Sequence, residues 1–110
     1  MKLLPVVAAA AALAVSMGAK AAPDADAAMA LMKESGCTKC HAADKTKKGP
    51  SFKKTAEKYK GKADGFDKLH KWITEPHKAK MEDGTEEDHK VIKSNDEKAI
   101  KNVIDFILAQ

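Results

Sequence analysis

Apolar residues recur at helical spacing in four parts of the chain. The clearest pattern lies near the C-terminus, where five apolar residues share one face: Ile100, Val103, Ile104, Ile107 and Leu108. Shorter patterns of the same kind lie in residues 24–35, after Ser51, and between Asp64 and Pro76. The sequence therefore predicts four helices.

Helix-capping residues and helix breakers mark where these helices start and stop. The expected N-caps are Asp24 or Asp26, Ser51, Asp64, and Ser94 or Asn95 for the last helix. Gly36 suits the left-handed position after the first helix, and Pro76 cannot continue the third. Residues 42–50 and 78–94 are expected to be loops, and no stretch alternates for long enough to be a strand. The predicted fold class is all-α.

A five-residue motif, Cys37-Thr38-Lys39-Cys40-His41, directly follows the first helix. At this spacing two thiols can bond covalently to the vinyl groups of one haem, while the histidine ligates the iron. We therefore expect one haem c, attached through Cys37 and Cys40 and ligated by His41.

Other uses of a Cys-x-x-Cys pair fit this chain less well. A four-ligand zinc site needs a second cluster, but the chain has only two cysteines. A thioredoxin-like motif needs a βαβ pattern around it, which the sequence does not offer. A simple disulfide or redox pair is the main remaining alternative to haem attachment.

The first 21 of the 110 residues have the pattern of a signal peptide. Lys2 is followed by an apolar run from Leu3 to Val15, and small residues precede the cleavage site expected near Ala21. The run is shorter than the roughly 20 residues that span a bilayer, so we expect no integral membrane segment in the mature chain. We expect export to the periplasm and one domain, residues 22–110, small enough to benefit from a cofactor at its centre.

Charge is distributed unevenly along the chain, although the formal net charge is only +4. Lysines greatly outnumber acids between Asp44 and Lys80, whereas residues 82–88 hold five acids and no base. Most of these side chains fit a solvated surface, but they can also dock a redox partner protein by charge complementarity. Nucleic acid is not expected as a partner, because the chain has no arginine and no basic stripe interleaved with aromatic residues.

With these features the sequence resembles the small monohaem class I c-type cytochromes of the bacterial periplasm. The resemblance rests on the helix leading into residues 37–41, on Gly49-Pro50-Ser51-Phe52, and on the amphipathic last helix. It implies about four helices packed around one covalently attached haem. It also implies that the Pro50 carbonyl accepts the second ring N–H of His41, which would fix the tautomer of the ligand.

The second axial ligand is less well defined by the sequence. The family usually takes a methionine from the loop before the last helix, and this loop offers Met81, His77 and His89. The resemblance favours His89, because the family's ligand lies a few residues before the last helix and His89 is closer to Ser94 than Met81 is. Met81 is the next candidate and His77 the least favoured. A second histidine would lower the reduction potential relative to methionine.

These features together suggest a periplasmic electron-transfer protein that cycles Fe(III)/Fe(II) with His41 and His89 as axial ligands, and not an enzyme. Nothing in the sequence supplies a substrate pocket or an acid–base pair. One alternative is a haem with an open or weakly held sixth site that binds a small ligand, as a sensor or enzyme. Another is a subunit of a larger multi-haem redox complex.

Overall fold

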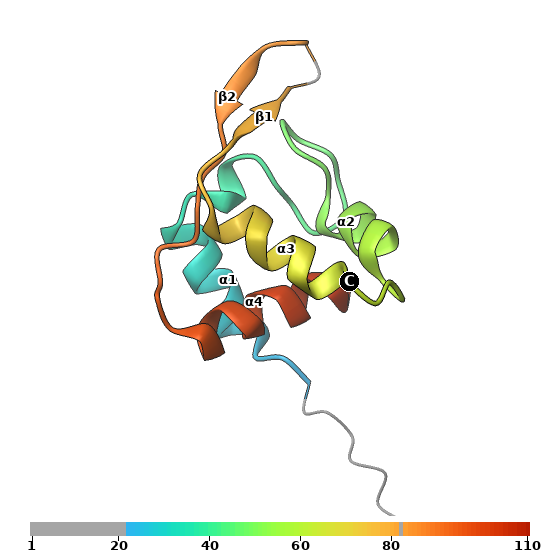
Figure 1. Ribbon diagram of the computed structural model, residues 1–110, viewed down its shortest axis with the longest axis vertical. Coiled ribbons are helices and arrows are strands. Elements are labelled where there is room, and N and C mark those ends of the chain that lie inside the picture. Colours follow the sequence, from blue (N-terminus) through green and yellow to red (C-terminus); the bar gives the residue numbers. More distant parts are fainter. Residues whose placement is uncertain (1–21, 82) are drawn as a thin grey trace, which may run out of the picture.

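Four helices form the body of the protein in the computed structural model, which describes residues 22–81 and 83–110 (Figure 1). They are α1 (Ala25–Glu34), α2 (Phe52–Tyr59), α3 (Gly65–Thr74) and α4 (Glu97–Leu108). Within the described residues, none of the helices has the length and apolar character needed to cross a bilayer. The signal peptide expected at residues 1–21 lies outside the described part of the chain.

The helix starts agree with the sequence at α1 and α2 and differ at α3 and α4. The side chain of Asp24 accepts a hydrogen bond from the Ala27 N–H, and that of Ser51 accepts one from Lys54. Asp64 stands at the start of α3, but its side chain makes no capping bond there and pairs with Lys68 instead. The cap of α4 is Asp96, whose carboxylate accepts from the Lys98 N–H.

The expectation that Ser94 or Asn95 caps the last helix is therefore wrong by one or two residues. Ser94 Oγ accepts a hydrogen bond from the Asp96 N–H, 3.1 Å away. Ser94 thus stabilises the turn that precedes the helix, and the Asp96 side chain bonds the Lys98 N–H in the first turn of α4.

The hydrophobic core lies between α4 and the three other helices. Val103 and Ile104 of α4 and Met32 of α1 are almost completely buried. Ser35, with a relative exposure of 2%, is one of the two buried polar residues among those described. The other core residues come from all four helices and from the segment before α4: Ala28, Phe52, Leu69, Ile73, Ile92, Ile100 and Ile107. The amphipathic stripe seen in the sequence is therefore the face of α4 that packs against the core.

Helix α1 is also joined to α4 by a pair of hydrogen bonds at its N-terminal end. The Asn102 amide accepts from the Asp24 N–H at 2.8 Å and donates to the Asp24 carbonyl at 2.9 Å. Because Asp24 precedes the first turn of α1, its N–H would otherwise lack an intrahelical partner. This pairing fixes the start of α1 relative to α4. It therefore also fixes the position of residues 37–41, which follow the C-terminal end of α1.

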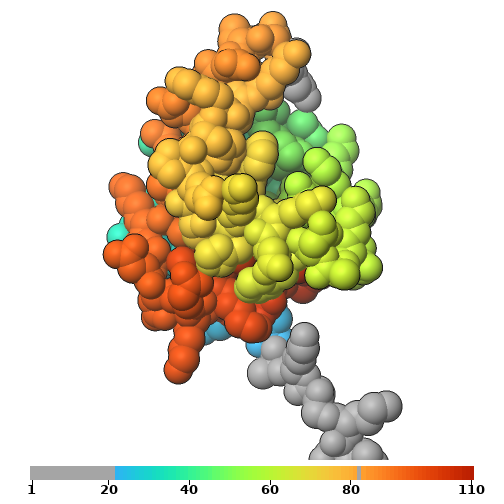
Figure 2. Space-filling view, in the orientation of Figure 1, coloured from blue at the N-terminus to red at the C-terminus, as the bar shows by residue number. Residues whose placement is uncertain are grey.

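A β-hairpin occupies the segment that the sequence suggested was only a loop. Strands β1 (Lys78–Lys80) and β2 (Glu86–Asp88) pair antiparallel, with Lys78 opposite Asp88 and Lys80 opposite Glu86. The hairpin stands above the helices in Figures 1 and 2. The expectation of no strand is therefore wrong for six residues, although the fold remains mostly helical.

Two hydrogen bonds fix the segment that follows the hairpin. The Ile92 N–H donates to the Ile73 carbonyl of α3 at 2.8 Å, and the Lys93 N–H donates to Ser35 Oγ at 2.8 Å. Ser35 in turn donates to the Leu31 carbonyl at 2.7 Å. Because the segment is tied to both α1 and α3, the residues just before it at the base of β2 have a fixed position.

Candidate haem site

A cavity of about 600 Å³ lies between the helices and the hairpin. Its walls come from the end of α1, residues 37–41, helices α2 and α3, and the hairpin, and its lining is mainly apolar. Cys37, Cys40, His41, Met81 and His89 all line it. The cavity therefore collects every sequence-predicted site residue except His77, which is not among its lining residues.

The two cysteines reach the cavity from a short 3-10 turn, Cys37–Lys39, that follows α1. Gly36, at φ 84°, reverses the chain at the end of α1 as the sequence predicted. Both thiols are free and half-buried, so no disulfide joins them. Burial raises the pKa of the Cys37 thiol above its ordinary value, a backbone hydrogen bond opposes that shift, and Cys40 adds to it.

His41 is held by the loop that follows it. Its Nδ1 lies 2.7 Å from the Pro50 carbonyl oxygen. Because a carbonyl can only accept, Nδ1 carries the proton and Nε2 is free to act as a ligand. The hydrogen bond expected from the family resemblance is therefore present. The ring also stacks on Phe52, with centroids 5.8 Å apart.

Gly49 allows the loop to approach His41 this closely. A Cβ on residue 49 would lie 2.5 Å from His41 Cε1 and 2.9 Å from Nδ1, inside van der Waals contact. The Gly49 N–H donates to the Cys40 carbonyl at 2.8 Å, and the Phe52 N–H donates to the Ala42 carbonyl at 2.9 Å. Residues 42–50 thus form the expected surface loop, but one that folds back onto the motif.

His89 follows directly after β2 and faces His41 across the cavity. The two ring centroids are 6.2 Å apart and the ring planes are inclined by 59°. His89 Nδ1 is buried and has no hydrogen-bond partner among the described residues. Burial lowers the pKa of His89, the neighbouring His77 and His41 lower it further, and the backbone of Lys90 opposes the shift, so the net effect favours the neutral imidazole that a metal requires.

His77 lies behind His89. The two imidazoles stack with centroids 4.6 Å apart and planes inclined by 19°, and His77 also contacts Trp72 at 4.0 Å between ring centroids. His77 Nδ1 donates to the Glu75 carbonyl at 2.9 Å, and its Nε2 is buried. The hydrogen bond at Nδ1 and the burial of Nε2 keep both ring nitrogens away from the open cavity.

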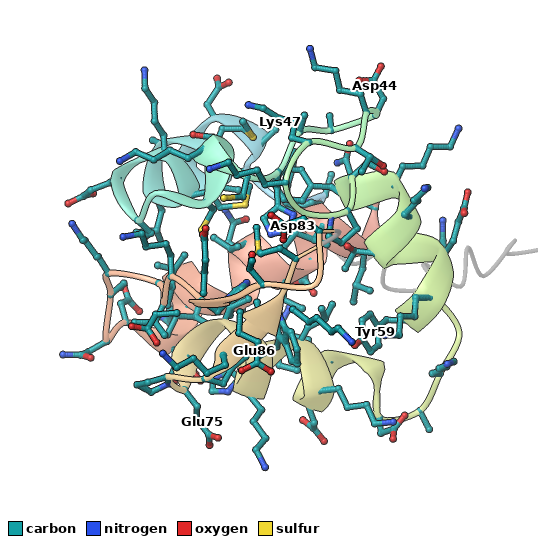
Figure 3. All side chains as sticks on the ribbon, turned by 90° about the horizontal axis from the view of Figure 1, so that it is seen from above. Asp44, Lys47, Tyr59, Glu75, Asp83 and Glu86 are labelled. Carbon is teal, nitrogen blue, oxygen red and sulfur yellow. The ribbon has the colours of Figure 1, made fainter. Side chains whose placement is uncertain are left out.

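The charged rim of the cavity combines lysines from several elements with acids from the hairpin. The lining lysines are Lys48, Lys54, Lys58, Lys80 and Lys90, and the lining acids are Glu87 and Asp88. Looking down on the hairpin, Figure 3 shows Asp83 between Glu86 and Lys47 in projection. Hydrogen bonds from Thr85 lower the pKa of Asp83, and the charge of Lys48 adds to that shift. The acidic hairpin thus lies within electrostatic range of the lysine-rich loop.

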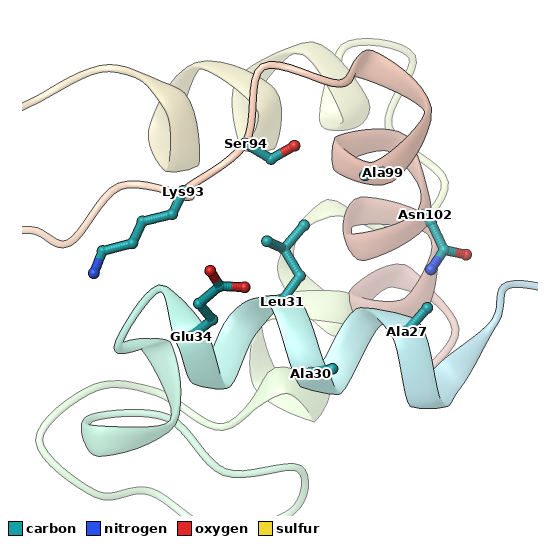
Figure 4. A pocket seen from close by; sticks show the side chains of 8 residues that line it. All are labelled: Ala27, Ala30, Leu31, Glu34, Lys93, Ser94, Ala99 and Asn102. Atoms are coloured by element: carbon teal, nitrogen blue, oxygen red, sulfur yellow. The ribbon is translucent and has the colours of Figure 1, made fainter.

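A second hollow, of about 490 Å³, lies between α1 and α4 (Figure 4). It is lined by small and apolar side chains, together with Glu34, Lys93, Ser94 and Asn102. None of its lining residues is a cysteine, histidine or methionine. It therefore lacks the imidazole, thiol and thioether groups that ligate haem iron.

The donors of the larger cavity fit a covalently held haem. Two thiols lie on one wall, one imidazole is oriented by a hydrogen bond to its second nitrogen, and a second imidazole with a buried Nδ1 faces it. The surrounding surface is apolar, as a porphyrin requires. This combination supports a covalently held haem iron in a mainly apolar cavity.

The fold and the cavity together define a small class I c-type cytochrome. The family model described as Cytochrome c matches residues 25–110, and the chain belongs to that family. The protein is therefore a haem-based electron-transfer protein with covalently bound haem c, and the Cys37 and Cys40 pair is consistent with the attachment motif.

Two relatives illustrate the similarity. The crystal structure of the class 1 cytochrome MtoD from Sideroxydans lithotrophicus ES-1 is 54% identical in sequence, covers 80% of this chain and 97% of that one, and superposes with a TM-score of 0.75. Cytochrome c-551 of Allochromatium vinosum is 44% identical over 48 residues, which is 44% of this chain and 51% of that protein. The match thus spans about half the length of that curated relative.

Sequence reasoning does not assign the stacking of Phe52 on His41 or the position of His77, whereas the family resemblance already placed Gly49-Pro50 beside His41. The helical pattern places Phe52 only on the inner face of a helix, yet its ring stacks on His41. The charge pattern does contain a signal for the position of His77. Residues 78–80 are Lys-Ala-Lys and residues 86–88 are Glu-Glu-Asp, so the two segments around Gly84 can pair as a hairpin, and that pairing places His77 opposite His89.

Proposed function

We propose that this protein is a periplasmic electron carrier whose single haem c is bonded to Cys37 and Cys40 and ligated axially by His41 and His89. The observation that carries the proposal is the separation of 6.2 Å between the centroids of the two imidazoles, across a cavity lined by both cysteines.

This separation fits two imidazoles on one metal ion. A histidine nitrogen binds a metal at about 2.0 Å, so two such nitrogens on opposite sides are about 4 Å apart, and their ring centres about 6 Å apart. The distance of 6.2 Å between the two ring centroids agrees with this estimate. Met81 lines the same cavity, but its backbone belongs to the turn of the hairpin, where its N–H donates to the Thr85 carbonyl at 2.7 Å.

The nitrogen positions support the same assignment. His41 Nδ1 is occupied by the Pro50 carbonyl, and His89 Nδ1 is buried away from the open cavity, so each ring offers Nε2. His77 offers neither nitrogen, since one is bonded to Glu75 and the other is buried. His89 is therefore favoured over both of the other candidates.

Such a ligand set suits electron transfer. The haem supplies one-electron Fe(III)/Fe(II) chemistry when bound. Histidines on both faces would leave no position for a substrate or a small ligand, and the second imidazole would place the potential below that of a His/Met cytochrome. Fixed ligands and an apolar cavity would also limit rearrangement when the electron moves.

The proposal includes export. Residues 1–21 have the composition of a signal peptide, and residues 22–110 would form the exported domain. Partner proteins would dock by charge complementarity at the cavity mouth. The lysines around it outnumber the acids that line it, so an acidic surface on the partner fits this rim.

Optical and ferric EPR spectroscopy of three variants tests the ligation. His89→Ala should open the sixth position, so the reduced protein should bind carbon monoxide readily, while Met81→Ala and the control His70→Ala should stay closed. His70 is a suitable control because it pairs with Glu97 at 2.8 Å and does not line the cavity. A methionine–iron charge-transfer band in the wild type, or a His89→Ala variant with an unchanged six-coordinate spectrum, would disprove His89 ligation.

A further inference from the structure

His77 and His89 are cross-strand neighbours at the base of the hairpin. Lys78 pairs with Asp88, so the next pair toward the helices is His77 with His89, and the His89 N–H donates to the His77 carbonyl at 2.9 Å. Residues directly opposite each other in an antiparallel ladder project to the same face. The stacking of the two imidazoles is therefore a consequence of the hairpin register.

His77 is itself held from two further sides. Its Nδ1–H donates to the Glu75 carbonyl at 2.9 Å, and the indole of Trp72 lies against it with ring centroids 4.0 Å apart. Trp72 belongs to α3, and it also approaches His89, with centroids 5.7 Å apart. The imidazole of His77, which covers one face of His89, is thus held both by the hairpin and by α3.

The two histidines that face the cavity are oriented by different means. His41 is oriented by a hydrogen bond from Nδ1 to a carbonyl, which is the usual device for a metal-binding histidine. His89 Nδ1 is buried and makes no hydrogen bond of ordinary geometry to any described residue, and the backbone of Lys90 is near enough only to oppose part of the fall in the pKa of His89. Aromatic contacts define the plane of its ring instead, with His77 on one face and the edge of Trp72 beside it.

We propose that His77 is a positioning residue that sets the rotation of the His89 ring by stacking, with Trp72 packed beside both imidazoles. This inference rests on the proposed ligation of the iron by His89. The stack takes the place that a hydrogen bond has on the His41 side, and it holds the two imidazole planes at the observed angle of 59°.

The angle between two axial imidazole planes has a spectroscopic signature. It controls how the ferric d orbitals split, so the spread of the ferric g values grows as the planes turn from parallel toward perpendicular. A fixed angle far from parallel predicts one low-spin ferric species with a large g anisotropy. If the His89 ring could rotate, the protein would instead show broadened signals or several species.

Four variants test the role of the stack in the haem-loaded protein. His77→Ala removes the ring, His77→Leu keeps volume without a flat face, and His77→Phe keeps the flat face without nitrogens. His70→Ala is the matched control, because it removes an imidazole from α3 outside the cavity. The readouts are the ferric g values and the affinity of the ferric protein for added cyanide, which must displace His89.

We expect His77→Ala and His77→Leu to change or broaden the g values and to raise cyanide affinity roughly two- to tenfold, the range that one aromatic pair contributes. His77→Phe and His70→Ala should keep a single species and an affinity within about twofold of the wild type. If His77→Ala does not fold, the comparison of His77→Leu with His77→Phe carries the same test.

Two results would overturn the proposal. The first is a His77→Leu variant whose EPR spectrum and cyanide affinity equal those of the wild type. The second is a His77→Phe variant that changes as much as His77→Leu does. That second result would show that the nitrogens of His77, and not its flat ring, position His89. Failure of the His89 ligation itself is seen separately, as a methionine band in the wild type or an unchanged spectrum in His89→Ala.

Discussion

His41 Nδ1 lies 2.7 Å from the carbonyl oxygen of Pro50. The bond fixes the tautomer of His41 and makes its Nε2 a stronger donor to a metal, because the proton on Nδ1 is partly shared with the carbonyl. The geometry of this hydrogen bond depends on Gly49, the residue before Pro50. Gly49 lies against the His41 ring, and a Cβ added at residue 49 would be only 2.5 Å from His41 Cε1.

Gly49→Ala should therefore disturb both the ring and its hydrogen bond. We expect a loss of about 1–3 kcal/mol in the free energy of unfolding, which is typical of overpacking. We also expect the reduction potential to rise by on the order of tens of millivolts, because a weaker hydrogen bond makes His41 a poorer donor to ferric iron. Chemical denaturation and a redox titration of the haem-loaded protein measure the two effects.

Gly61→Ala is the control for Gly49→Ala. Gly61 has φ 77°, and a methyl group added there would meet nothing within 4 Å, so the cost is only that of a left-handed backbone. That cost is about 1 kcal/mol. The haem spectrum and the potential of Gly61→Ala should match the wild type. A Gly49→Ala protein with an unaltered potential would show that the Pro50 bond does not depend on the contact at residue 49.

Ser35 should stabilise the connection between α1 and the segment before α4. Its buried hydroxyl accepts from the Lys93 N–H and donates to the Leu31 carbonyl, so Ser35→Ala removes both of these part-buried hydrogen bonds. We expect a loss of about 1–3 kcal/mol. Ser94→Ala, which removes only an exposed hydrogen bond to Asp96, should cost less than about 1 kcal/mol. Equal losses in the two thermal unfolding experiments would contradict this role.

The helices and the attachment motif could be predicted because their signals are local. The stripe from Ile100 to Leu108 has the period of a helix and packs against the core as expected. The chemistry of residues 37–41 depends on spacing, which can be read directly from the chain. Gly36 was also predictable, because a helix that must turn abruptly favours a residue that tolerates positive φ.

The hairpin and the stack behind His89 could not be predicted in the same way. Three-residue strands are too short to show a period of two, and both strands consist mostly of charged residues. Opposite charges do meet across the strands, as Lys78 and Asp88 do at 2.6 Å, but both side chains are exposed and such pairs add little stability. The contact between His77 and Trp72 depends in turn on where α3 ends relative to the hairpin, which no local pattern specifies.

Asp64 should titrate below the ordinary range of an aspartate. A hydrogen bond and the charge of Lys68 hold the pKa of Asp64 down, and Lys62 adds a smaller effect. Because the folded pKa is depressed, the pairing stabilises the protein above the unfolded pKa of about 3.9 and is lost as pH falls through the folded pKa. Carboxyl-carbon NMR should show the Asp64 pKa rising most in Lys68→Gln, less in Lys62→Gln, and not at all in Lys98→Gln. An unchanged midpoint in Lys68→Gln would contradict the pairing.

Each cysteine of the motif should carry one covalent bond to the haem. Cys37→Ser and Cys40→Ser should each leave a single thioether, and the α band of the pyridine haemochrome should move to longer wavelength by a similar amount in the two variants. The control is Ser35→Ala, which alters the neighbouring backbone contacts but keeps both thiols. A haemochrome spectrum of either serine variant that equals the wild type would refute covalent attachment through that residue.

The lysines at the cavity mouth should govern the rate of reaction with an acidic partner. Lys48 and Lys58 line the cavity, whereas Lys98 lies in the first turn of α4 and does not. Ferricyanide serves as a small anionic oxidant whose encounter with the rim is steered by charge.

Lys48→Gln and Lys58→Gln should slow the reaction of ferricyanide with the reduced protein and make its rate less dependent on ionic strength. The difference from the wild type should shrink above about 0.1 M salt, where the screening length is about 10 Å. Lys98→Gln changes the net charge by the same amount, so equal slowing in all three variants would mean that net charge, and not the rim, steers the encounter.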